Sequence, residues 1–74
     1  MSQADFDPEY VFSNHAPSPE KLAHYDALHN AAKEYSRVIL AHVPVCADRA
    51  AALRLLREAS MIACAAVALD GRLK

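Results

Sequence analysis

Hydrophobic and polar positions recur in steps of three and four residues along the chain, which is typical of amphipathic helices. Between residues 19 and 42 the residues of one such seam are Tyr25, Leu28, Ala32, Tyr35, Ile39 and His42, widened by Leu22 and Val38. Ser18 and Pro19 suit an N-cap and a first helical position. Pro44 disfavours helix at the residue before it. These signals predict a first helix over about 19–42.

The second predicted helix covers about residues 47–69. Asp48 suits the amide-rich start of a helix, and Asp70 followed by Gly71 supplies a stop at its end. Because the connection is short, we expect this helix to fold back antiparallel to the first. From Ala59 to Leu69 it has no charged residue. A helix that is apolar on every side is buried, and one partner helix covers only one side, so the pattern predicts self-association.

Residues 1–17 form a predicted N-terminal arm. It contains two prolines, several acidic residues and an aromatic cluster of Phe6, Tyr10 and Phe12. Chain ends are mobile by default, but the aromatic rings lead us to expect that the arm covers the helices. The sequence thus predicts an all-α fold in one small domain of residues 1–74, with the arm over 1–17 and a helical hairpin over 18–70.

Composition narrows the class of protein. The net charge of -1 argues against a strongly electrostatic partner such as duplex DNA. Two cysteines provide no disulfide framework and fit a reducing compartment. We expect no signal peptide, since the first ten residues lack a basic and an apolar segment. The charge-free run is too short to span a bilayer. These features predict a soluble, intracellular protein with no membrane partner.

Few residues suggest chemistry. The candidate metal ligands are His15, His24, His29, His42, Cys46 and Cys64, but none forms the closely spaced pairs of a zinc site. The single glycine excludes a glycine-rich phosphate loop. Cys46 with a histidine elsewhere leaves a small hydrolase as one alternative. We expect no metal, no cofactor and no catalysis, because no preorganised constellation is visible.

The remaining candidates are residues whose side chains suit the binding of a ligand. Aromatic rings of the arm suit stacking on bases, and Asn14 and His15 suit hydrogen bonds to base edges or phosphate. Basic residues such as Lys33, Arg37 and Arg49 suit phosphates. The same residue types also serve as helix core or as a solvated surface. The residues alone therefore indicate a small helical oligomer that binds an anion.

Two stretches, residues 12–39 and 48–69, resemble the small phage family called anti-CBASS protein two. In the first, the matching positions are Phe12, His15, Pro17, Tyr25, Ala32 and Lys33. In the second, they are Leu53, Leu56, Glu58, Ala59, Met61, Ala63, Ala65, Ala66, Val67 and Ala68. Asn14 stands where the family pattern has a tyrosine, and His29 where it has a basic residue.

The resemblance implies a function. Members of this family are non-catalytic sponges that bind cyclic di- and trinucleotide signals in the host cytoplasm and so block CBASS-type antiphage defence. It implies a homohexamer with ligand pockets where protomers meet. Carried onto this chain, the candidate ligand-binding residues are Tyr10, Phe12, Asn14, His15, Tyr25, His29 and Lys33, with Arg49 and Arg57 in a second pocket. The alternatives are a sponge for cyclic ADP-ribose-type signals, which would be anti-Thoeris, and a helical module that inhibits a host protein.

Overall fold

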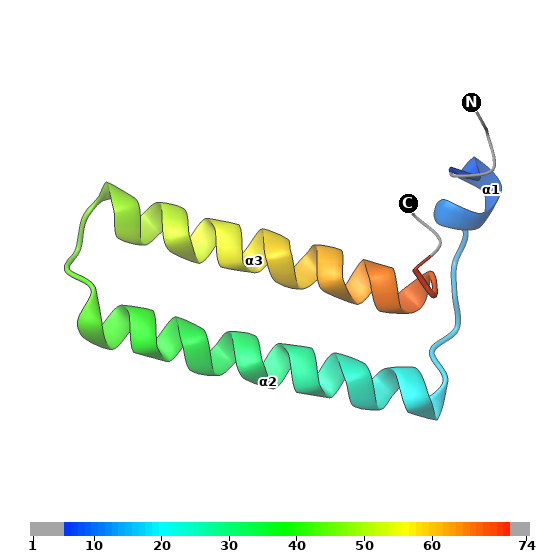
Figure 1. Cartoon of the computed structure of the whole chain (residues 1–74), viewed down its shortest axis with the longest axis horizontal. Helices are drawn as coiled ribbons and strands as arrows, with labels where there is room; N and C mark the ends of the chain where they lie inside the picture. The colour runs from blue at the N-terminus through cyan, green and yellow to red at the C-terminus, as the bar shows by residue number, and fades with distance from the viewer. Residues whose placement is uncertain (1–5, 72–74) are drawn as a thin grey trace.

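The computed structural model describes residues 6–71 and contains three helices there: α1 (Pro8–Val11), α2 (Pro19–His42) and α3 (Ala47–Ala68). Helices α2 and α3 lie side by side as an antiparallel hairpin, with the connecting turn at one end and α1 beyond the other (Figure 1). Residues 6–71 include no β-strand. The all-α prediction is confirmed, and the two long helices have the predicted ends to within one residue.

Local signals place the ends of the long helices. Ser18 is the N-cap of α2, and its hydroxyl accepts a hydrogen bond of 3.2 Å from the amide of Lys21. Val43 ends α2 in an extended conformation, as a residue before proline prefers. At the end of α3, Asp70 and Gly71 have φ angles of 55° and 73°. Their amides donate to Val67 O and Ala66 O, which is the Schellman pattern that stops a helix.

Helix α1 was not predicted. It is one short turn in which Asp7 is the N-cap and accepts from the amide of Glu9 at 3.1 Å, with Pro8 in the first turn. These are ordinary start signals. They were overlooked because a helix of four residues has no room for a hydrophobic period.

The hairpin encloses very little core. Among the described residues only Ile39 and Leu69 are buried. Tyr25, Leu28 and Ala32 are half-buried along the seam. The prediction was wrong in this respect at four seam positions, which are exposed: Leu22, Tyr35, Val38 and His42. The apolar arc of α2 is wider than the strip that one partner helix covers, so positions at the edges of the arc remain open.

The molecule is one helix layer thick. Its extents are 45 × 32 × 15 Å and its Cα radius of gyration is 15.5 Å. A compact domain of this length has a radius of gyration of about 11 Å. Residues 6–71 therefore place no second layer over either flat face of the hairpin. No helix of the described residues is both long and apolar enough to cross a membrane.

The N-cap of α2 gives a test of the local signals. Replacing Ser18 with Ala removes the hydroxyl that accepts from Lys21 N, and we expect the free energy of unfolding to fall by about 1 kcal/mol. Ser18→Asp, which retains an acceptor, should stay close to the parent. Urea denaturation at one fixed protein concentration measures both. Equal loss in the two variants would contradict a capping role.

Candidate ligand-binding groove

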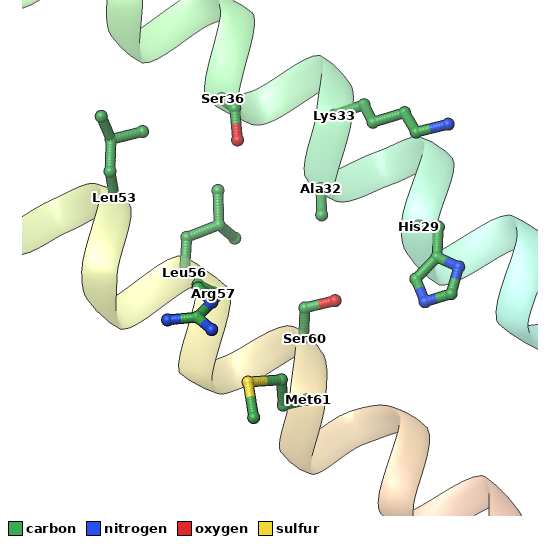
Figure 2. Close-up of a pocket in the computed structure, with 9 residues that line it drawn as sticks. All are labelled: His29, Ala32, Lys33, Ser36, Leu53, Leu56, Arg57, Ser60 and Met61. Carbon is green, nitrogen blue, oxygen red and sulfur yellow. The ribbon is translucent and has the colours of Figure 1, made fainter.

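A groove of about 310 Å³ runs between α2 and α3 on one face of the hairpin. Figure 2 shows that its rims carry polar and flexible side chains from both helices, with small and apolar side chains between them. The lining residues are His29, Ala32, Lys33, Ser36, Leu53, Leu56, Arg57, Ser60 and Met61. We call this the cationic groove.

The cations of the groove lack carboxylate partners. Of the basic residues within 6–71, Lys21, Arg37 and Arg54 each form an ion pair, with Asp70, Glu34 and Glu58. In the same range, Lys33 and Arg57 pair with no carboxylate. An unpaired cation beside an apolar floor is a favourable position for a phosphate, because the ion pair forms without breaking an existing one.

A second groove of about 350 Å³ lies on the opposite face. It shares Ala32, Leu56 and Ser60 with the cationic groove, since these side chains sit on the seam itself. Its remaining lining residues are Leu28, Ala31, Tyr35, Ala59 and Ala63, and none of them is charged. We call it the apolar groove. The two faces of the hairpin are therefore chemically different.

The imidazole ring of His29 contacts a side chain of the other long helix. Its Nε2 atom lies 3.5 Å from the sulfur of Cys64, across the seam on α3. Sulfur is a weak hydrogen-bonding atom, so this contact favours one orientation of the imidazole ring at the rim of the cationic groove. Cys64 itself is half-exposed and not in a disulfide.

The arm joins the open end of the hairpin. The hydroxyl of Tyr10 donates to Leu69 O at 3.0 Å, and the Nε2 of His15 lies 2.7 Å from Tyr10 O, which accepts from it. The two rings meet edge to face with centroids 4.6 Å apart. Nearby, the Lys21 ammonium donates to Ala68 O and to Asp70, both at 3.2 Å. We call these contacts the end latch.

Other predicted site residues lie apart from the cationic groove. Phe12 is 79% exposed on the arm, with its ring centroid 6.1 Å from that of Phe6, and Asn14 is exposed. His29 is ten residues beyond Pro19, which is about 15 Å along α2. One chain therefore does not bring the arm and the groove cations together. Tyr25 is half-buried on the seam.

The two arginines predicted for one pocket are separated. Arg49 donates to Val43 O at 3.3 Å beside the turn, whereas Arg57 lines the cationic groove with His29 and Lys33. Ser36, Leu53 and Ser60 line the same groove and were not predicted as site residues. Their signal was spacing, because 29, 33 and 36 on α2 and 53, 57 and 60 on α3 each follow helical steps.

Within the described part of the chain, no three His, Cys, Asp or Glu side chains gather as a metal-ion site would require. What the cationic groove offers is one apolar floor and three basic groups on its rims.

Comparison with known proteins decides the family. Residues 7–68 match the family described as Acb2/Tad1, hairpin domain. The chain belongs to the Acb2/Tad1 hairpin family. The match covers α1, both long helices and the turn between them, so membership in the Acb2/Tad1 hairpin family confirms the resemblance noted in the sequence. No curated protein and no solved structure gives a significant match to the chain.

The end latch predicts a stability effect at Tyr10. Tyr10→Phe retains the ring beside His15 but removes the hydroxyl that donates to Leu69 O. We expect the free energy of unfolding to fall by about 1 kcal/mol, measured by urea denaturation at fixed concentration without ligand. Tyr25→Phe is the control, since its hydroxyl has no hydrogen-bond partner within residues 6–71. An unchanged stability in Tyr10→Phe would show that the latch contributes nothing.

Proposed function

We propose that this protein is a non-catalytic sponge that binds cyclic oligonucleotide signals, cyclic dinucleotides or trinucleotides, and withholds them from CBASS-type defence in the host cytoplasm. Membership in the Acb2/Tad1 hairpin family supports the class of function. The observation that carries the proposal for this chain is the cationic groove, where Lys33 and Arg57 pair with no carboxylate within residues 6–71 and line the same groove as apolar side chains.

The groove suits the two chemical parts of a cyclic nucleotide. Lys33 and Arg57 supply charge-assisted donors for phosphate oxygens, and the planar guanidinium of Arg57 suits bidentate contact. Ala32, Leu53 and Leu56 provide an apolar surface for a base or ribose. Ser36 and Ser60 add hydroxyls that donate or accept. The division between charged rims and an apolar floor is typical of small-molecule sites.

The ligand would extend beyond one chain. The groove has a volume of about 310 Å³, which is at the small end of the range for ligand sites, roughly 300–1,000 Å³. A ring of two or three nucleotides is a large ligand for a groove of this size. We propose that the site is completed by another copy of the chain in a homo-oligomer, a hexamer by family resemblance. The exposed ring of Phe12 and the exposed Asn14 would then reach the groove of a neighbour.

Arg57 provides the sharpest test of the groove. Arg57→Gln removes the charge at the rim, and we expect affinity for the best-bound cyclic nucleotide to fall by about 10- to 100-fold, since a hydrogen bond to a charged group contributes roughly 1.5–3 kcal/mol. Isothermal titration calorimetry with a panel of cyclic di- and trinucleotides and cyclic ADP-ribose isomers measures it.

Arg54→Gln is the matched control, because Arg54 lies one turn earlier on the same helix, is paired with Glu58, and does not line the groove. Its affinity should match the parent. If the protein binds cyclic ADP-ribose isomers and no other member of the panel, the alternative function, a sponge for cyclic ADP-ribose-type signals, would be supported. A folded protein that binds no member of the panel would remove the proposal.

Sequestration also predicts the fate of the ligand. After incubation at stoichiometric concentrations and heating to unfold the protein, we expect the cyclic nucleotide to be recovered intact, because a sponge holds its ligand without breaking a bond in it. Liquid chromatography with mass detection reports it, with ligand heated alone as the control. Linear or hydrolysed product that appears only with protein would instead support a hydrolase.

A further inference from the structure

Each long helix contributes a cation and a hydroxyl at the same spacing to the cationic groove. Lys33 and Ser36 are three positions apart on α2, and Arg57 and Ser60 are three positions apart on α3. Side chains at this spacing on a helix are neighbours, with Cβ atoms roughly 5–6 Å apart. Each rim of the groove therefore offers a charged donor beside a hydroxyl.

The two pairs are related by an approximate two-fold axis. Because α2 and α3 run antiparallel (Figure 1), equal spacings along the two helices point in opposite directions across the groove. Figure 2 shows Lys33 and Arg57 on opposite rims of the groove, with Ser36 and Ser60 toward its opposite ends. The axis passes through the groove between the two cations.

The other lining residues follow the same relation in position. Ala32 and Leu56 each precede the cation of their helix by one residue, and His29 and Leu53 each precede it by four. Met61 is the exception. The axis thus relates positions throughout the lining, and it relates chemistry at the cations and the hydroxyls.

The hydroxyls of Ser36 and Ser60 are open to a ligand. A serine within a helix commonly donates to the carbonyl four residues earlier, but neither hydroxyl has a hydrogen-bond partner within residues 6–71. Both residues are half-buried. No carboxylate of the described residues lines the groove, so these two hydroxyls supply the side-chain oxygens that accept from a donor of the ligand.

We propose that Ser36 and Ser60 are specificity-determining residues, each accepting a hydrogen bond from a ribose hydroxyl beside a phosphodiester held by the cation of the same helix. In a ring of ribonucleotides with 3′,5′ linkages, a free 2′-hydroxyl lies next to every phosphodiester. A ring of two identical nucleotides has two-fold symmetry and presents this unit once to each rim. The groove therefore favours such a ring over one of three nucleotides, and over cyclic ADP-ribose, whose two phosphates form a single pyrophosphate.

This inference rests on the proposed function and specifies its ligand. The sugar–phosphate edge of the ring would occupy the groove. Its bases would reach beyond the groove, where the proposed function places the neighbouring copy.

A thermodynamic cycle in the full chain tests the two serines. Isothermal titration calorimetry measures the affinities of the parent, Ser36→Ala and Ser60→Ala for 3′,5′-linked cyclic di-adenosine and di-guanosine monophosphate and for the corresponding 2′-deoxy rings. Alanine favours helix, and circular dichroism and sedimentation velocity verify the fold and mass of each variant.

We expect each substitution to weaken binding of the tighter-bound ribose ring by about 3- to 10-fold, the size of one neutral hydrogen bond. The affinity for the matching deoxy ring should be the same in the parent and in both variants, because the hydroxyl that the serine reads is then absent. The losses at the two serines should be similar, since a two-fold ring meets both rims alike.

Unchanged affinity in both variants, or a loss at one serine without the other, would overturn the inference. Equal losses for the ribose and deoxy rings would also overturn it, because the serines would then act only through the structure of the groove. Tighter binding of cyclic tri-adenosine monophosphate than of both two-nucleotide rings would overturn it and leave the proposed function standing. A folded protein that binds none of these compounds would remove both.

Discussion

The thickness of a single helix layer governs the rest of this structure. A domain normally buries its apolar surface between two layers of secondary structure, and here α2 and α3 meet only along one seam. Burial of a large apolar side chain contributes about 1.5–3 kcal/mol, yet only Ile39 and Leu69 among the described residues are buried. Ordering each residue of the backbone costs about 1–2 kcal/mol. The described residues of the hairpin therefore gain little free energy from burial within the single chain.

The same constraint explains how the arm is used. A two-helix hairpin leaves the last carbonyls of α3 without helical partners, and Tyr10 and Lys21 donate to those of Leu69 and Ala68. Tyr10 thus serves the end of a helix in its own chain, although its aromatic ring had suggested a ligand contact. Phe12, two residues later, is left exposed. The arm thus has one aromatic residue, Tyr10, bound to the end of α3 and another, Phe12, exposed to solvent.

Sequence reasoning succeeded where the controlling signal is local. Ser18, Pro19 and the Asp70–Gly71 pair act within one helical turn, and they placed the ends of the long helices. The sequence is less informative where the rotation of one helix against the other determines which side chains are covered and which lie together. Whether Tyr35 is covered, or whether Arg57 lies beside Lys33 or beside Arg49, depends on the angle at which α2 meets α3. The contact between Tyr10 and Leu69 joins residues 59 positions apart, and no local pattern encodes it.

The two faces also explain why neighbouring residues have different environments. Lys33 and Tyr35 are two positions apart on α2, yet one lines the cationic groove and the other the apolar groove. Residues two positions apart on a helix are separated by about 200° around its axis. Such residues therefore lie on opposite faces of a single helix layer. Substitutions at positions that line only the cationic groove then change the contacts offered to an anion without altering the lining of the apolar groove. A chain of this size can thereby vary the side chains of one groove while it keeps those of the other.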